Sequence, residues 1–267
     1  MASDDPGSGP VVHLHVSDGV ATLTLDDAKR RNAMSPELGD ALAARVRELT
    51  GRSDVRACVL TGAGGAFSAG GDLAMLERLR RSSAEECREF MLRFYGRYLS
   101  ILELGLPLVS AVRGAAIGAG LCVAMACHVM VVDEDAKLAL NFAELGLHPG
   151  MGATYFTPRR VGPERASELL LSGRRFDGRE AARMGLALEA VPAADVVVRA
   201  QAIAASFARC APLAVRALAA ELGPDRGALR LALEREAAEQ AISYGSQDLG
   251  EGLKAAAERR APAFKGE

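Results

Sequence analysis

Two glycine-rich segments are the features of this sequence most able to do chemistry. Residues 60–72 read LTGAGGAFSAGGD and residues 113–120 read RGAAIGAG, each after an apolar run and before a predicted helix. The first N–H groups of a helix are unpaired and favour negative charge, and small side chains let a ligand approach them. Two such groups aimed at one point would form an oxyanion hole. On spacing alone, the same glycines could simply permit tight turns and close packing.

Hydrophobic periodicity and turn residues predict the elements that position these segments. Alternating runs at 11–16 and 20–25 around Ser17, Asp18 and Gly19 predict a β-hairpin. Ser35-Pro36-Glu37 predicts the start of a helix that runs to about Thr50. Further strands are predicted at 55–61, 108–112 and 129–133, and helices at 72–81, 84–104, 121–127 and from 162 to the end. Alternating strands and helices predict an α/β fold with parallel βαβ units.

The chain divides into three predicted parts. Residues 1–10 form an acidic, small-residue leader that we expect to be disordered, residues 11–194 form the main body, and residues 195–267 form a helical C-terminal region. That region is rich in Ala, Leu, Glu and Arg, with more apolar positions than one thin layer would bury. Either a neighbouring subunit or the chain itself would cover them. We interpret the region as a trimerisation or lid element.

Composition argues against several classes of function. The 267 residues carry 32 basic and 34 acidic side chains without a block of one sign, which disfavours a nucleic-acid or membrane partner. The five cysteines are scattered, and the four histidines form no spaced ligand set with them. No apolar run approaches the length of a membrane span, and the first residues do not resemble a targeting signal. We therefore expect a cytoplasmic protein without a metal.

Short motifs follow one another along nearly the whole chain. They are RNAM at 31–34, LTG at 60–62, FSAGGDL at 67–73, AAIGAG at 115–120, LGLHPGMG at 145–152, LSGRR at 171–175, AARMGL at 181–186 and RRAPAFK at 259–265. In order and spacing these motifs resemble those of the crotonase (enoyl-CoA hydratase/isomerase) family. The resemblance implies the crotonase spiral of ββα units with a helical C-terminal region. It also implies an acyl-coenzyme A substrate, no cofactor beyond that coenzyme A, and a homotrimer that often pairs into a hexamer.

The resemblance also implies which residues form the site. The oxyanion donors are the N–H groups of Gly71 and Ala119, the latter at a position where the family usually has glycine. Lys29 or Arg30, and Lys265 from the C-terminal end, are expected near phosphates of coenzyme A. The other expected substrate or coenzyme A contacts are Ala33, Ala69, Asp72, Leu73, Ile117, Cys122 and Phe142.

The usual catalytic glutamates of this family are replaced here. Hydratases use one glutamate to activate water and another to exchange a proton at the α-carbon. Counting from the second glycine segment, those positions hold Cys122 and Phe142, neither of which can do this work unaided. Glu144, two residues later, could act as a lone base, which suits isomerisation better than hydration. Other possible proton donors are His148, Tyr95, Tyr98 and Tyr155, and Asp72 could instead cap its helix.

Two alternative functions remain open from the sequence. Ser68 within AFSAG could be the nucleophile of a degenerate hydrolase elbow, which would make the protein an acyl-CoA thioesterase. The missing glutamates could also mean a non-catalytic acyl-CoA binder. A nicotinamide cofactor is disfavoured, since no GxGxxG motif occurs at 60–65. The sequence favours an enoyl-CoA hydratase/isomerase-type enzyme over both alternatives.

Overall fold

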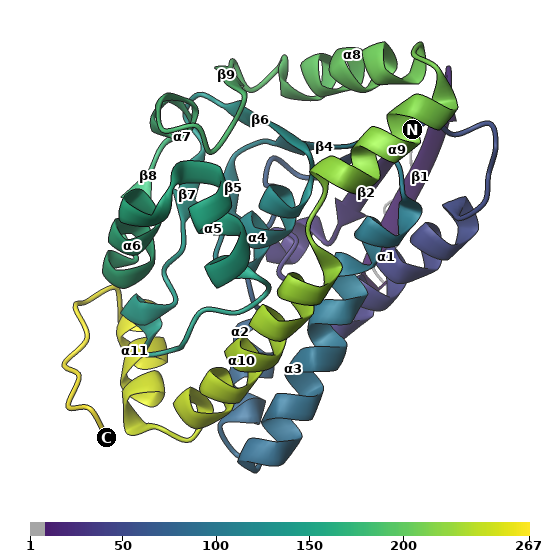
Figure 1. Cartoon of the computed structure of the whole chain (residues 1–267). Helices are drawn as coiled ribbons and strands as arrows, with labels where there is room; N and C mark the ends of the chain where they lie inside the picture. The colour runs from purple at the N-terminus through teal and green to yellow at the C-terminus, as the bar shows by residue number, and fades with distance from the viewer. Residues whose placement is uncertain (1–8) are drawn as a thin grey trace.

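A six-stranded sheet forms the centre of this computed structural model, which describes residues 9–267 (Figure 1). Its strand order is β1-β2-β3-β4-β6-β9. The strands are β1 (Val11–Ser17), β2 (Val20–Asp26), β3 (Ala57–Gly62), β4 (Leu108–Val112), β6 (Val129–Asp133) and β9 (Glu189–Val191). β1 and β2 pair antiparallel, and all other neighbours pair parallel. The predicted parallel sheet is confirmed, and residues 1–8 of the predicted leader lie outside the described residues.

Local sequence explains the first strands. Asp18 and Gly19 connect β1 to β2 with φ angles of 51° and 78°, the two positive values that a type I′ hairpin turn requires. Ser17 therefore pairs with Val20, as the hairpin prediction implies. All residues of β3 are buried, because helices cover both faces of this parallel part of the sheet.

Helices cover both faces of the central sheet. On one face, α8 (Val196–Ala208) packs its alanines against Val59, Val109 and Val131. The larger core, on the other face, contains α1 (Pro36–Leu49), α3 (Ala84–Leu99) and α4 (Ala119–Ala126). α10 (Arg226–Tyr244) lies along α3 (Figure 1). The predicted start of α1 is confirmed, since the Ser35 side chain accepts a hydrogen bond from the Leu38 N–H.

A second, three-stranded sheet was not predicted. It consists of β5 (Ala115–Ile117), β7 (Lys137–Ala139) and β8 (Arg175–Phe176) in that order. The prediction of continuous helix from residue 162 to the end is therefore wrong, because β8 and β9 interrupt it. The helix predicted over 84–104 ends at Leu99 and continues as the 3-10 turn η2 (Ser100–Leu104). The helix predicted to start at Leu121 begins at Ala119.

The remaining elements complete the surface around the two sheets. They are η1 (Ala28–Arg30), α2 (Leu73–Leu79), η3 (Ala143–Leu145), α5 (Ala153–Val161), α6 (Pro163–Ser172), α7 (Gly178–Arg183), α9 (Pro212–Leu222) and α11 (Gln247–Glu258). Within residues 9–267, no single helix is long and apolar enough to cross a membrane, although the bent pair of α8 with α9–α10 meets the criteria of length and composition jointly.

Candidate active site

The two glycine-rich segments lie side by side at the edge of the second sheet. The N–H groups of Phe67 and Ser68 both donate to the Ala115 carbonyl, and the Ile117 N–H donates to the Ser68 carbonyl. Both segments line one cavity of about 390 Å³. The contact is close enough to require glycine, since a Cβ on Gly70 would lie 2.8 Å from the Ile117 carbonyl oxygen. The glycines therefore do permit close packing, and the same packing brings the backbone of both segments to one cavity.

Gly71 and Ala119 contribute backbone N–H groups to this cavity wall. Gly71 lies just before α2, and Ala119 is the first residue of α4, where helix geometry leaves an N–H unpaired. Neither N–H donates a hydrogen bond to any residue in the described part of the chain. Gly118, which precedes Ala119, has φ 51° and donates its own N–H to the Ala139 carbonyl. This bond fixes the start of α4 against β7.

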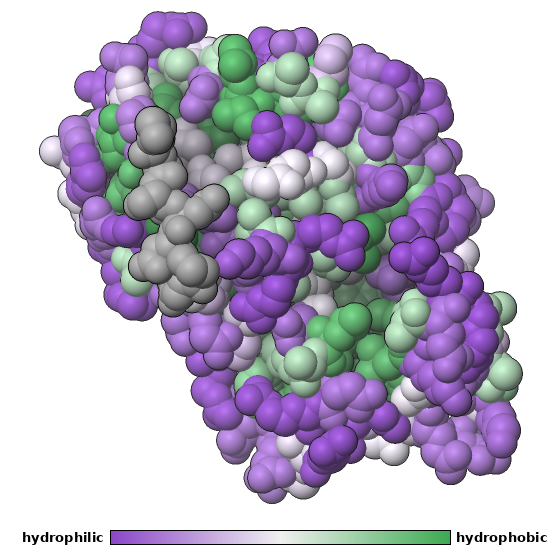
Figure 2. Space-filling model, turned by 180° about the vertical axis from the view of Figure 1, so that it is seen from behind, coloured by the Kyte–Doolittle hydropathy of each residue, from purple (hydrophilic) through white to green (hydrophobic). Residues whose placement is uncertain are grey.

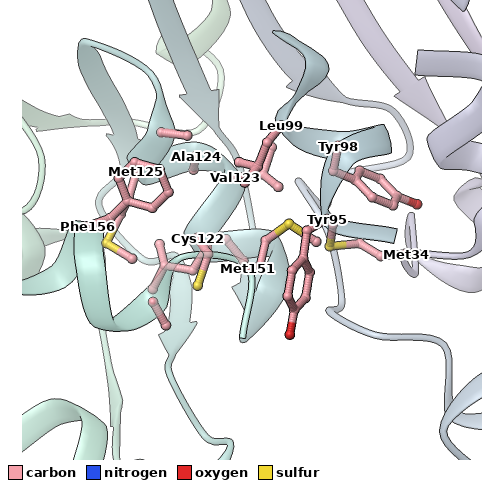
Figure 3. Close-up of a cluster of buried hydrophobic side chains, with 14 of the residues drawn as sticks. Met34, Tyr95, Tyr98, Leu99, Cys122, Val123, Ala124, Met125, Met151 and Phe156 are labelled. Carbon is pink, nitrogen blue, oxygen red and sulfur yellow. The ribbon is translucent and has the colours of Figure 1, made fainter. Parts of the chain in front are cut away.

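Apolar side chains line much of the cavity, and no carboxylate among residues 9–267 does so. Phe142 lines it, as predicted. Cys122 lies behind the wall, fully buried among Val123, Met125 and other apolar neighbours (Figure 3). Burial, and to a lesser extent the nearby Glu236 carboxylate, raises the pKa of the Cys122 thiol well above its usual value. The thiol therefore stays protonated at neutral pH and cannot act as a base.

The structure brings some predicted coenzyme A contacts together and not others. Ala69, Leu73 and Ile117 line the cavity. Asp72 caps α2 by accepting from the Met75 N–H, and also lies 3.2 Å from the Arg30 guanidinium. The predicted site residues that do not line the cavity are Lys29, Arg30, Ala33, Asp72, Cys122, Glu144 and Lys265. Of these, Lys29, Arg30, Glu144 and Lys265 are exposed.

The C-terminal end, which carries Lys265, folds back on α11. The backbone N–H of Lys265 donates to Asp248, and Arg260 forms an ion pair with Glu251. The Arg260 guanidinium, together with the Ala263 N–H, lowers the pKa of the Glu251 carboxyl to about 2. This anchoring holds Lys265 away from the cavity of its own chain.

Three cations at the cavity were missed by the sequence analysis. Arg31, Lys137 and Arg175 line it, are exposed, and form no ion pair with any residue in the described range. Ala139 is the strand partner of Arg175 and lies two residues from Lys137, so both side chains project from the same face of the second sheet. Only the pairing of β7 with β8 shows that Lys137 and Arg175 lie together. Arg31 belongs to the RNAM motif at 31–34, which the sequence analysis had singled out.

A polar pair from α3 and α10 lies at the cavity, where its Gln240 member lines the wall. The Tyr95 hydroxyl donates to Gln240 Oε1 at 2.7 Å, and Gln240 Nε2 donates to the His148 carbonyl at 2.8 Å. Gln240 lines the cavity although its side chain is almost fully buried. The other candidate donors lie elsewhere, because Tyr98 donates to the Ser35 carbonyl and neither His148 nor Tyr155 lines the cavity.

Glu236, one turn before Gln240 on α10, is a buried carboxylate that the sequence analysis also missed. It accepts hydrogen bonds from the N–H groups of Gly152 and Thr154 and from the Thr154 hydroxyl, at 2.6–2.8 Å. It therefore caps the start of α5. Burial raises its pKa despite these donors. Both oxygens are occupied and the residue does not line the cavity, so its role is structural.

Comparison with known proteins identifies the family. The family model for enoyl-CoA hydratase/isomerase matches residues 15–267. A probable enoyl-CoA hydratase of Mycobacterium tuberculosis is 39% identical over 247 residues, which are 92% of this chain and 93% of the relative. A probable enoyl-CoA hydratase of Bacillus subtilis is 34% identical over 96% of this chain and 99% of its own length.

Solved structures agree with this assignment. An enoyl-CoA hydratase from Bacillus halodurans superimposes with a TM-score of 0.84 at 26% identity, covering 91% of this chain and 99% of that one. One from Mycobacterium avium subsp. paratuberculosis gives 0.82 at 27% identity, with 96% and 100% covered. The chain belongs to the enoyl-CoA hydratase/isomerase family, and the predicted crotonase fold is confirmed.

Proposed function

We propose that this protein is an enzyme of the enoyl-CoA hydratase/isomerase type that stabilises a thioester enolate. The observation that carries the proposal is the pair of N–H groups of Gly71 and Ala119 on one cavity wall, which donate to no residue within 9–267. When a proton leaves the α-carbon of a thioester, negative charge develops on the carbonyl oxygen. Two backbone donors aimed at that oxygen stabilise the enolate more than the neutral ester, which lowers the barrier.

The cavity favours enolate chemistry other than two-carboxylate hydration. Hydration by that route needs two carboxylates that exchange protons, and the described cavity wall has none. Glu144 would have to turn inward from an exposed position on η3 to serve as a lone base. Double-bond isomerisation needs one proton shuttle rather than two, so it fits the cavity better.

The missing carboxylates also favour a second candidate, a non-catalytic acyl-CoA binder. Purified protein incubated with a panel of enoyl-CoA and hydroxyacyl-CoA esters separates the candidates by mass spectrometry and chromatography. An enzyme of the proposed type changes an ester, either by gain or loss of water or by a shift of the double bond at constant mass. A binder retains the esters unchanged, and a thioesterase acting through Ser68 releases free thiol. Retention of every ester unchanged would contradict the catalytic proposal.

Arg31, Lys137 and Arg175 are proposed to hold phosphates of coenzyme A, in place of Lys29, Arg30 and Lys265. The Lys137→Gln/Arg175→Gln double variant should bind a saturated acyl-CoA about tenfold more weakly, because exposed ionic contacts contribute roughly 1 kcal/mol or less each. Isothermal titration calorimetry at low salt measures this loss.

Two controls make the test of these cations specific. The same acyl group on pantetheine, which lacks the phosphates, should bind the double variant and the original protein equally. Arg199→Gln removes an exposed cation that pairs with Glu189 outside the cavity, and it should leave acyl-CoA binding unchanged. An equal loss with pantetheine would show that the two cations do not contact phosphate.

We further propose that the chain forms a homotrimer, or a hexamer of two trimers. α9 buries only Ala219 and exposes Leu213, Leu218 and Leu222. In the view from behind, apolar side chains gather in patches between polar ones (Figure 2). A helix with this pattern is stabilised when a neighbouring subunit covers it. Light scattering should give three or six times the mass of the chain, and a monomer would contradict the proposal.

A further inference from the structure

Gln240 is a polar side chain at the wall of the cavity, and its orientation is fixed. Its side chain is 2% exposed. Oε1 accepts from the Tyr95 hydroxyl, and Nε2 donates to the His148 carbonyl. The His148 carbonyl can only accept a hydrogen bond, so the Gln240 atom that faces it is the amide nitrogen. The Tyr95 hydroxyl therefore faces the amide oxygen. The neighbouring cavity residues Met91, Phe94 and Leu147 are apolar.

The surrounding backbone accommodates this pair closely. A Cβ on Gly150 would lie 2.5 Å from the Tyr95 oxygen and 2.7 Å from Gln240 Nε2, so only glycine leaves room for both. Burial raises the pKa of the Tyr95 phenol well above its usual value. Tyr95 therefore keeps its proton and holds Gln240 Oε1 in one direction.

One hydrogen of Gln240 Nε2 remains without a partner within residues 9–267. An amide N–H that lines a cavity is satisfied by water or by an acceptor on the ligand. A plain alkyl chain would displace water from it and leave the donor unpaired, which is costly in a buried site. A ligand oxygen in the same place would restore the hydrogen bond.

We propose that Gln240 selects acyl groups that carry a hydroxyl or keto oxygen on the chain beyond the thioester. Tyr95 acts as the positioning residue that fixes the carboxamide. This inference rests on the proposed acyl-CoA function and adds the class of acyl group. Sites built to hydrogen-bond a substrate oxygen discriminate against analogues without it far more strongly than apolar pockets discriminate by size.

The test compares 3-hydroxybutyryl-CoA with butyryl-CoA, which differ only by the hydroxyl group. Calorimetry on the full chain should show at least about tenfold tighter binding of the hydroxylated ester, because an unpaired buried donor costs more than 1 kcal/mol. Gln240→Met keeps the length of the side chain and removes the donor, so the preference should fall to about twofold or less while butyryl-CoA still binds. Tyr95→Phe should reduce the preference partly.

Tyr98→Phe is the matched control, since it deletes a buried phenol from the same helix that donates to Ser35 outside the cavity. It should retain the preference. A double variant, Tyr95→Phe/Gln240→Met, removes both partners and keeps the test valid if a single variant unfolds. Equal binding of the two esters by the original protein would overturn this inference alone, and so would an undiminished preference in the double variant. Failure to bind either ester would overturn the proposed function as well.

Discussion

Replacing Gly71 with proline should lower the turnover of any acyl-CoA ester that the protein converts by about a hundredfold to a thousandfold, the usual effect of losing one oxyanion donor. Proline has no N–H, and the Gly71 N–H makes no hydrogen bond within the described chain, so its removal breaks no hydrogen bond between those residues. The loss should appear in kcat rather than in KM, because the donor acts mainly on charge that develops during the reaction. Steady-state kinetics on the ester found in the panel measures it.

Gly71→Ala is the matched control for this experiment. A Cβ at this position would meet only the Leu76 side chain, at 3.7 Å or more, so alanine fits and keeps the N–H. Its turnover should stay close to that of the original protein. Ala119→Pro deletes the second donor at the first position of α4, where proline is well tolerated, and should cause a similar drop. Unchanged turnover in both proline variants, with melting temperatures preserved, would rule out the oxyanion assignment.

The elements that sequence predicts well are those with a strong local signal. β4 is apolar except for Ser110 and has the predicted bounds of residues 108–112, and α1 begins after the predicted Ser35 cap. β5, β7 and β8 have two or three residues each, too few for any periodicity to be visible. Their pairing is set by contacts between residues that are about 20 to 40 positions apart, which a local pattern does not contain.

The residues of the candidate site divide in the same way, into those that a sequence motif indicates and those that only the folded chain brings together. Gly71 and Ala119 were predicted as donors from the resemblance of the two glycine-rich segments to the family motifs, and both residues line the cavity. Lys137 and Arg175 could not be predicted in this way, since they join the cavity through the unpredicted second sheet. Gln240 and Tyr95 are 145 positions apart. One signal was available on α10, where Glu236 and Gln240 place two polar side chains one turn apart within an alanine-rich stretch.

Glu236 should be the residue whose loss most affects the stability of the cavity wall. Glu236→Ala leaves the Gly152 N–H and both Thr154 donors without partners at the start of α5. Gly152 is buried, and an unsatisfied buried donor costs about 1–3 kcal/mol, whereas Thr154 is exposed and its donors can turn to water. We therefore expect the free energy of unfolding to fall by about 1–3 kcal/mol. Urea unfolding at fixed protein concentration measures this change. The same helix end follows Gly150, which packs closely against Tyr95 and Gln240, so the position of this pair should loosen as well.

Glu234→Ala is the control for Glu236→Ala, because it removes a partly exposed glutamate of the same helix that forms a surface ion pair with Arg230. It should change the free energy of unfolding by about 0.5 kcal/mol or less. Glu236→Gln keeps one of the two acceptor oxygens, so its free energy of unfolding should lie between those of Glu236→Ala and Glu234→Ala. If Glu236→Ala were no more destabilising than Glu234→Ala, the carboxylate would not hold α5 in place. The orientation of Tyr95 and Gln240 at the cavity would then depend on Gly150 and the packing of α3 against α10 alone.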